Sequence, residues 1–588
     1  MDSNNVNVVE NVSRENPGFD SAPEYDDRSK KIPPPEFNGT DLPGKAEVGS
    51  AAEIERPTWD NQYQFLMSCI ATSVGLGNVW RFPFIAYQNG GGAFLIPYII
   101  VLILIGKPMY YLETALGQFS SSNCVKVWAL SPAMKGTGYA QALSAFYVVS
   151  YYMSIVGLCL YYLIMSFQSV LPWSVCQPEW VDCVPSGEVA NLSLIQNRPI
   201  TSAELYFTAV TLPGADKGIL FFITPQWTKL LELRVWYAAT TQVFFSLSTC
   251  SGALIMFSSF NKFSQNVYRS LQKTVVFYNH LNNVSPCSRD SMIVTTLDTF
   301  TSLISGITIF GILGNLAFQM GEDDISTIIK SGGSSLAFVS YPDAIAQSPF
   351  VPQLFSSLFF LMMAVLGVGS GVALFSTVNT IFLDAFPKVP TIVTSAVMCS
   401  ACFLVGLVYV TPGGQYILEL VDHYGGTFMR LFAAIVEIIG LENMCLDIEY
   451  MLGLKTSVYW RFCWGIVTPL MMMTVFFYAL VTSDQLKFGD YIYPDGAYLA
   501  GSFLQYFGIA LVPLFMAVTF WKYRTSTFVE TIKTSFKAKK TYGPSIPQKK
   551  AEWREFRSNA KYERNLIRKN WFHHVGLSLI GGYRRGRK

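Results

Sequence analysis

The chain has 588 residues, of which 51% are hydrophobic and only 14% are charged, whereas about 25% of an ordinary soluble domain is charged. This composition is typical of polytopic membrane proteins. The formal net charge of +2 is too small for the electrostatic footprint of a nucleic-acid-binding protein, so no nucleic acid is expected as a partner.

The chain begins with a polar segment, residues 1–58, that we expect to be a disordered cytoplasmic tail without a cleaved signal peptide. Apolar stretches of about 20 residues, the length that a helix needs to cross a bilayer, then predict ten spans. They lie at about 61–87, 92–117, 137–171, 236–260, 293–318, 350–384, 391–410, 416–440, 458–481 and 497–521. The predicted fold class is therefore an all-α polytopic membrane protein with a transmembrane domain over residues 59–525.

An even number of spans puts both termini on the same side of the membrane. The C-terminal tail, residues 526–588, is basic, so the positive-inside rule places that side in the cytoplasm. The predicted external loop, 172–235, then contains Cys176, Cys183 and the sequon at Asn191. These residues suit an oxidising and glycosylating compartment, which predicts a disulfide bond and a glycan in this loop.

Two of the ten spans are interrupted by polar residues and glycines. The first contains "SVGLGN" (73–78) and the fourth contains "FFSLSTCSG" (244–252). In a bilayer, irregular backbone is tolerated only where it faces protein or a water-filled cavity, because each unsatisfied amide costs several kcal/mol. A pair of broken helices indicates an ion and substrate site near the midplane, where freed carbonyls hold Na⁺ and helix N-termini attract a carboxylate. The alternative is that the small residues only allow close helix packing.

Polar side chains near the first interruption add to this site. Asn78 offers an oxygen suited to a hard cation, and Arg81 needs a carboxylate partner, for which Asp422 is a candidate. The stretch "SYYMS" (150–154) places two tyrosines in the third span, either as buried hydrogen-bonding groups or in an interfacial belt. The motifs HExxH, GxSxG and GxxxxGK[ST] do not occur, so we expect neither an enzyme nor an ATP-driven pump.

Several stretches resemble those of the neurotransmitter:sodium symporters, most closely the sodium-dependent nutrient amino acid transporters. They are "SVGLGNVWRFPFIAYQNGGGAFLIPY", "GKPMYYLETALGQF", "TTLDTFTS", "SYPDAIA" and "YWRFCWGIVTPL". The likeness runs from about Arg56 to Trp521. It implies a bundle of two inverted five-helix repeats within twelve spans, with substrate and Na⁺ bound at unwound helices 1 and 6, which match the first and fourth spans here. It further implies sodium-coupled symport of an amino acid across the plasma membrane, with the lipid bilayer and the substrate as partners and a homo-oligomer left open.

The resemblance also implies a set of site residues. The residues expected at the first sodium site are Ser73, Asn78, Ser246 and Asp298, and those at the second are Ala71, Val74, Leu366 and Ser370. The residues expected to contact the substrate are Ser73, Gly75, Gly77, Val148, Tyr152, Phe245, Ser246, Ser248, Ser251 and Leu374. The family's chloride site corresponds to Tyr98, Gln242, Ser246 and Ser302. The outer gate corresponds to Arg81 and Asp422, and the inner gate to Arg56, Trp59 and Asp384.

Departures from the family pattern refine the expected activity. Family members that carry monoamines have an aspartate at the position of Gly75, so Gly75 favours a neutral, zwitterionic amino acid. Asp298 replaces the asparagine of many members and supplies a fixed negative charge, which argues against chloride dependence. Gly369 removes a ligand from the second sodium site, so one or two Na⁺ ions are expected. Ser251 and Gly369 together predict a wide cavity for bulky apolar or aromatic side chains.

The largest departure lies between the third and fourth spans. Where the family has helices 4 and 5, this chain has an apolar run of about seven residues within "AVTLPGADKGILFFITPQW" (209–227), which is too short to span. We therefore predict that this hairpin is absent and that a cytosolic insertion, 270–289, follows the fourth span. The alternative function is a non-transporting or regulatory truncated isoform.

Overall fold

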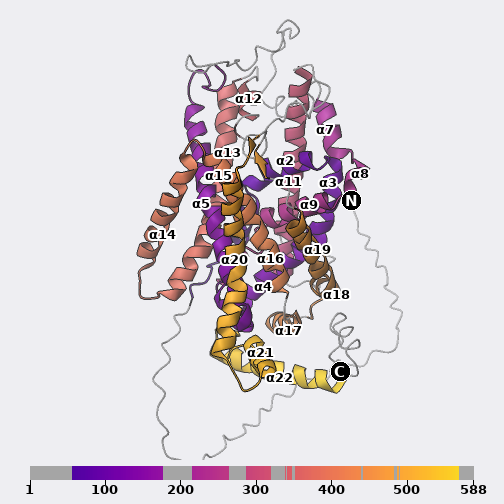
Figure 1. Ribbon diagram of the computed structural model, residues 1–588, viewed down its shortest axis with the longest axis vertical. Coiled ribbons are helices and arrows are strands. Elements are labelled where there is room, and N and C mark those ends of the chain that lie inside the picture. Colours follow the sequence, from indigo (N-terminus) through magenta and orange to yellow (C-terminus); the bar gives the residue numbers. More distant parts are fainter. Residues whose placement is uncertain are drawn as a thin grey trace, which may run out of the picture. The chain divides into compact units, whose positions relative to one another are not determined.

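The computed structural model describes residues 56–175, 215–263, 286–319, 338, 341–346, 351–438, 441–453, 455–482, 486–488 and 491–567. The predicted N-terminal tail, except for residues 56–58, lies outside these ranges. The same holds for the predicted disulfide bond of Cys176 and Cys183, the sequon at Asn191 and most of the predicted insertion 270–289. The described part is almost entirely helical (Figure 1).

The elements up to α11, with short 3₁₀ or π segments labelled η, are α1 (Gln62–Ser73), η1 (Gly77–Arg81), α2 (Phe82–Gln88), α3 (Gly92–Val101), η2 (Leu102–Gly106), α4 (Lys107–Ser120), η3 (Lys126–Leu130), η4 (Pro132–Met134), α5 (Lys135–Met165), α7 (Ala215–Ile223), α8 (Trp227–Leu230), α9 (Leu233–Ser246), α10 (Ala253–Ser258) and α11 (Pro286–Gln319). The later elements are α12 (Tyr341–Ala346), α13 (Pro352–Ala385), α14 (Thr391–Gly406), η10 (Leu407–Val410), α15 (Gly414–Val421), η11 (Asp422–Thr427), α16 (Phe428–Glu437), α17 (Leu441–Leu452), α18 (Val458–Phe462), η12 (Cys463–Val467), α19 (Thr468–Val481), β1 (Lys487–Phe488), β2 (Tyr491–Ile492), α20 (Asp495–Lys522), α21 (Phe528–Phe536) and α22 (Pro547–Ile567).

Seven helical segments of the described chain are long and apolar enough to cross a membrane. They are Gly92–Ser120, Pro132–Met165, Asp290–Gly314, Pro352–Ala385, Thr391–Val410, Val458–Val481 and Asp495–Lys522. The other three predicted spans fall short for physical reasons. The first and fourth are divided into shorter helices, and the eighth carries four charged side chains along α15, η11 and α16. The total of ten spans stays a prediction.

Small residues allow two long helices of the bundle, α5 and α13, to pack closely. Gly367 and Gly371 lie one turn apart on α13, and α5 packs along this helix. A Cβ atom at these positions would lie 2.5 Å from a methyl carbon of Val156 and 1.8 Å from Cε of Met153. Small residues spaced by four positions let helix backbones approach each other, so α5 and α13 form a fixed frame beside the interrupted helices.

The predicted external loop 172–235 contains ordered helices that the sequence did not lead us to expect. The apolar run within residues 209–227 is too short to cross a membrane. It lies in α7, which packs against α11. Phe222 of α7 is 1% exposed and stacks on Phe310 of α11 with ring centroids 4.9 Å apart. Burial of such a ring stabilises the contact by about 1.5–3 kcal/mol, which is sufficient reason for the apolar segment to form a surface helix.

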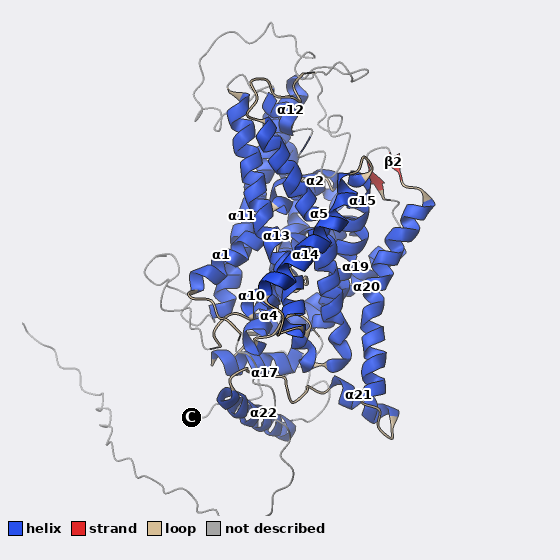
Figure 2. Cartoon of the chain, turned by 90° about the vertical axis from the view of Figure 1, so that its left-hand side faces the viewer, coloured by secondary structure: helices blue, strands red, loops and turns tan. Residues whose placement is uncertain are grey.

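The predicted C-terminal tail also begins with ordered helices. Figures 1 and 2 show α21 and α22 together with α17 at one end of the bundle, with α12 at the other end. Trp553 of α22 is 5% exposed and packs against Phe119, the penultimate residue of α4. The C-terminal segment is therefore attached to the bundle through an aromatic contact, although many of its basic side chains are exposed.

Candidate functional site

The first interrupted span leaves its helical path between Ser73 and Gly77. Val74 has an extended conformation (φ −80°, ψ 91°), and the backbone resumes as the π turn η1 at Gly77. The amides of the interruption are bound by side chains: Gly75 N–H donates to Asn78 Oδ1 (3.0 Å) and Leu76 N–H donates to the Tyr152 hydroxyl (3.3 Å). Asn78 and Tyr152 thus replace the hydrogen bonds that a continuous helix would provide.

The fourth span is interrupted between Ser246 and Ala253. Ser248 and Cys250 have positive φ angles of 52° and 57°, which are uncommon for residues with side chains, and Gly252 follows with a φ of 80°. The Cys250 N–H donates to Glu113 Oε1 of α4 (2.5 Å). The buried carboxylate of Glu113 therefore helps to hold this break in an irregular conformation.

Polar side chains from both interruptions meet around Asp298 of α11. Asn78 Nδ2 donates to Asp298 Oδ1 (2.7 Å), and Ser246 Oγ donates to the same oxygen (2.7 Å). Asp298 is fully buried, and its Oδ2 has no hydrogen-bond partner among the described residues. Ser73, which precedes Asn78 in the first interrupted span, is also buried, and its Oγ has no hydrogen-bond partner among the described residues. Such a set of oxygen donors with one negative charge fits a hard monovalent cation.

The residues predicted for the second sodium site lie on α1, its C-cap and α13. Ser370 Oγ lies 3.4 Å from the Ala71 carbonyl and 3.2 Å from the Thr72 carbonyl. Val74 is the C-cap of α1, and Leu366 precedes Ser370 by one turn of α13. Gly369 also faces α1, because a Cβ atom there would lie 2.9 Å from the Ala71 carbonyl oxygen.

A cavity lies between the two interruptions. Its lining residues are Thr72, Ser73, Gly75, Gly77, Asn78, Val148, Tyr152, Phe245, Ser246, Ser248, Ser370, Leu374 and Arg430. All predicted substrate contacts except Ser251 are among them. Residues of both interruptions therefore border the same cavity.

Ser251 and Gly369 do not line the cavity. The Ser251 hydroxyl instead donates to the Ser248 carbonyl (2.6 Å) within the broken segment, and Gly369 faces Ala71. The preference for a bulky or aromatic substrate, which was argued from these two positions, stays a prediction. Two lining residues, Thr72 and Arg430, were not predicted. The signal for Arg430 was present in the sequence as an arginine within the eighth predicted span, where a charge normally indicates function.

The predicted outer gate is closed above the cavity. Arg81 Nη2 lies 3.5 Å from Asp422 Oδ2, and the Arg81 guanidinium lies 4.0 Å from the ring centre of Phe245. The Tyr151 hydroxyl donates to Asp422 Oδ1 (2.6 Å). Tyr151 and Tyr152 are both buried and hydrogen-bonded, so the alternative of an interfacial belt does not hold for this pair.

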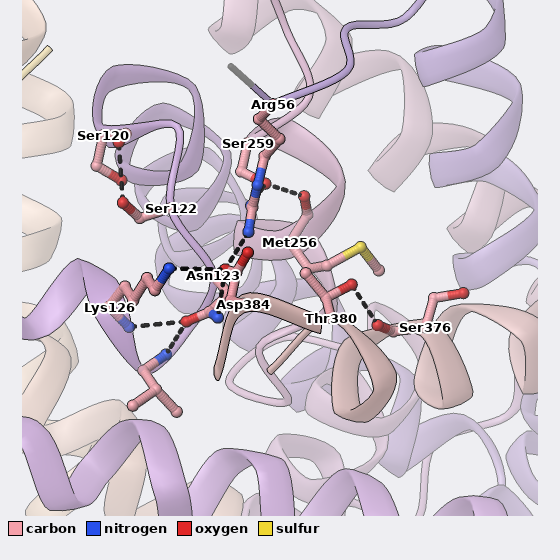
Figure 3. A network of polar contacts seen from close by, with 11 residues as sticks. Arg56, Ser120, Ser122, Asn123, Lys126, Met256, Ser259, Ser376, Thr380 and Asp384 are labelled. Carbon is pink, nitrogen blue, oxygen red and sulfur yellow. Dashed lines mark hydrogen bonds and ion pairs between the residues drawn. The ribbon is translucent and has the colours of Figure 1, made fainter. Parts of the chain in front are cut away.

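The predicted inner gate is paired in the same structure (Figure 3). Arg56 forms an ion pair with Asp384 and a hydrogen bond to Ser259. Asn123 Nδ2 also donates to Asp384 (2.7 Å), and Lys126 Nζ lies 3.7 Å from it. The indole of Trp59 donates to the Phe257 carbonyl (3.0 Å). The residues of both predicted gates are therefore paired in the same structure.

The four residues predicted for chloride surround the same polar cluster. Gln242 Nε2 donates to the Gly77 carbonyl (3.2 Å), Ser302 accepts from Asn78 Nδ2 (2.9 Å), and Tyr98 is fully buried on α3. Ser246, however, donates to the carboxylate of Asp298. An ionised carboxylate at this place repels an anion, so these residues do not fit chloride while Asp298 is charged.

Comparisons with known proteins concern the family and the fold of this chain. The family model described as "Sodium:neurotransmitter symporter family" matches residues 56–208, 200–284 and 272–523. Sodium-dependent nutrient amino acid transporter 1 of Drosophila ananassae is 41% identical over 630 residues, covering 90% of this chain and 95% of the relative. The protein of the same name from Drosophila melanogaster is 42% identical over 604 residues, covering 87% and 91%. The crystal structure of MhsT in complex with L-phenylalanine shares the fold, with a TM-score of 0.57 and 22% identity over 72% of this chain and all of MhsT.

Proposed function

The chain belongs to the sodium:neurotransmitter symporter family, and we propose that it couples Na⁺ entry to the uptake of a neutral amino acid across the plasma membrane. The observation that carries this proposal is the buried carboxylate of Asp298, which accepts hydrogen bonds from Asn78 and Ser246, two residues that line the cavity between the interruptions. Both termini are cytoplasmic in the proposed topology.

The substrate class is proposed from the chemistry of the cavity. Gly75 has no side chain, and a Cβ atom there would lie only 2.5 Å from Ser370 Oγ, so the position has no room for a fixed carboxylate. The substrate then has to supply its own carboxylate to the cations and to the Tyr152 hydroxyl. A zwitterionic amino acid meets this requirement, and the names of the two Drosophila relatives support the same class.

The driving force follows from the number of Na⁺ ions. Each ion that moves down a potential of about 100 mV releases about 2.3 kcal/mol, and a tenfold gradient adds about 1.4 kcal/mol. Two ions therefore provide roughly 7 kcal/mol, enough for a substrate gradient of about 10⁵. The residues expected at the first site include the carboxylate of Asp298, whereas Gly369 leaves the second site with one side-chain ligand fewer than many relatives have, the Ser370 hydroxyl being the one that remains. We infer that coupling is closer to one ion than to two.

The decisive experiment measures uptake of labelled neutral amino acids by cells that express this chain, in Na⁺ and in choline. A second form carries a helical hairpin inserted after Thr208, and a third lacks residues 270–289. The family match is divided at 200–208 and at 272–284, close to these two positions. Sodium-dependent uptake by the unmodified chain is the expected result. Uptake by the hairpin-containing form alone would instead identify this chain as a non-transporting isoform.

A further inference from the structure

Arg430 is the one residue of α16 that lines the cavity between the two interruptions. Arg430 lies on α16 and is 3% exposed, and it lines the same cavity as Tyr152 and Ser246. Its Nε is buried without a hydrogen-bond partner among the described residues. Asp422, which pairs with Arg81, and Glu113, which accepts from the Cys250 N–H, interact with Arg430 electrostatically, but neither forms an ion pair with it in the described chain. The guanidinium is nevertheless always charged, so a positive charge remains within the cavity wall.

The contrast with Arg81 shows why this charge matters. The two guanidinium groups lie 4.0 Å and 5.5 Å from the centre of the same Phe245 ring. Arg81 is paired with Asp422 at the outer gate, which leaves little net charge. The ring face of Phe245 is a weak partner for a guanidinium and cannot replace a carboxylate. Arg430 is therefore the cation whose field acts on the cavity.

The position of Arg430 relative to the expected substrate decides what this field acts on. The α-carboxylate of a substrate is expected beside Tyr152, Gly75 and the cations. Arg430 shares the remaining part of the lining with Val148, Ser248 and Leu374, which are the residues expected around the substrate side chain. A charge on that side chain would interact with Arg430 through a medium of low dielectric constant, where electrostatic interactions are strong.

Building on the proposed amino acid uptake, we propose that Arg430 sets the charge selectivity of the side-chain end of the cavity. It rejects amino acids with a cationic side chain and favours an anionic side chain over its neutral isostere. Neutral side chains remain substrates because they neither repel the guanidinium nor need a counter-charge. Arg430 is in this sense a specificity-determining residue that acts on the substrate directly.

The test uses matched pairs of competitors against uptake of labelled leucine. Lysine and norleucine differ by the terminal ammonium group, and glutamate and glutamine differ by the charge of the side chain. Ratios of inhibitory concentrations within one variant do not depend on its expression level. In Arg430→Met, we expect the lysine-to-norleucine ratio to fall about tenfold or more and the glutamate-to-glutamine ratio to rise by a similar factor. Arg430→Lys keeps the charge and should keep both ratios near those of the native chain.

Opposite changes in the two ratios distinguish charge from shape. If Arg430 only supported the packing of Phe245, both ratios would stay constant or move together, and the proposal would be overturned. If Arg430→Lys behaved like Arg430→Met, charge selectivity would also be excluded. If the native chain took up no neutral amino acid at all, the proposed function would fail instead. Should Arg430→Met not reach the surface, Arg430→Gln provides the same loss of charge with a polar side chain.

Discussion

Asn78, in the turn after the first helix break, donates a 2.7 Å hydrogen bond from Nδ2 to Oδ1 of Asp298 on α11. The same Nδ2 also reaches the Asp298 carbonyl (3.1 Å), so two oxygens of one residue orient the amide. In this orientation, Asn78 Oδ1 accepts a hydrogen bond from the Gly75 N–H. Because Asp298 Oδ1 also accepts from Ser246, a single carboxylate connects both interrupted helices and keeps its second oxygen free of donors from the described residues.

Replacing Asp298 by asparagine should weaken Na⁺ binding and introduce chloride dependence. The amide retains the shape and the hydrogen bond to Ser246 but removes the negative charge that offsets a cation. We expect the half-saturating Na⁺ concentration for uptake to rise about tenfold or more, and uptake to become faster in chloride than in gluconate. Asp216→Asn, at an exposed position of α7, serves as the control. An unchanged Na⁺ dependence of Asp298→Asn would contradict a role at the cation site.

A methyl group at Gly75 should abolish uptake without preventing folding. The added Cβ would lie 2.5 Å from Ser370 Oγ and 3.3 Å from the Tyr152 hydroxyl, so the second cation site and the carboxylate site are both displaced. We expect uptake by Gly75→Ala to fall at least about tenfold at equal surface expression. Gly157→Ala is the matched control, because nothing lies within 4 Å of its Cβ. Equal uptake by the two variants would show that Gly75 does not border the binding site.

Breaking the inner gate should expose Cys124 to the cytoplasm. Asp384 forms an ion pair with Arg56, accepts a hydrogen bond from Asn123 and lies 3.7 Å from Lys126 Nζ. Cys124, the neighbour of Asn123 in the sequence, is buried. In Asp384→Ala, we expect a membrane-permeant maleimide to label Cys124 several-fold faster, with Cys124→Ala identifying the labelled site. Asp422→Ala opens the opposite gate and should leave the labelling unchanged. Swapping the two charges (Arg56→Asp together with Asp384→Arg) should restore slow labelling of Cys124 only in part, because an arginine at position 384 would repel Lys126.

The interruptions could be located from the sequence, whereas the direction of side chains within irregular backbone could not. Arg81 and Asp422 lie together in the structure as expected, and so do Arg56 and Asp384, while their role as gates stays a prediction. Glycines and polar residues in an apolar span are costly, so "SVGLGN" and "FFSLSTCSG" could be located without a structure. Ser251 lies in such a segment, where no helical period fixes the side chain, and it turns to the Ser248 carbonyl rather than to the cavity. Its orientation could not be predicted from spacing.

Arg430 was missed for a related reason. The π turn η11 (Asp422–Thr427) begins at Asp422 and ends before Arg430. The extra residue in such a turn rotates the following part of the helix about its axis. The face on which Arg430 lies therefore depends on a local helix irregularity that composition does not reveal. Helices α7 and α22 were missed because they are surface elements that depend on contacts with distant parts of the chain, such as Phe222 with Phe310 and Trp553 with Asp447.

Attachment of the C-terminal helix should depend on pH through Asp447. This residue of α17 lies between the eighth and ninth predicted spans and is 1% exposed. It accepts hydrogen bonds from Trp553 of α22 (2.8 Å) and from Tyr542 (2.9 Å). Burial raises the pKa of Asp447 from 3.8 to about 6, while Arg557 and the two hydrogen bonds oppose this change only in part.

Because the pKa of Asp447 is higher in the attached state than in an exposed aspartate, attachment binds a proton. Attachment is therefore strongest below about pH 4 and weakens as pH rises to about 6, by on the order of 3 kcal/mol in total. Hydrogen exchange of residues 547–567, corrected for the intrinsic effect of pH, should show less protection at about pH 7.5 than at about pH 5. Asp447→Asn should remove this difference, whereas Glu555→Gln, at another exposed position of α22, should retain it. The same pH dependence in Asp447→Asn would assign it to another group.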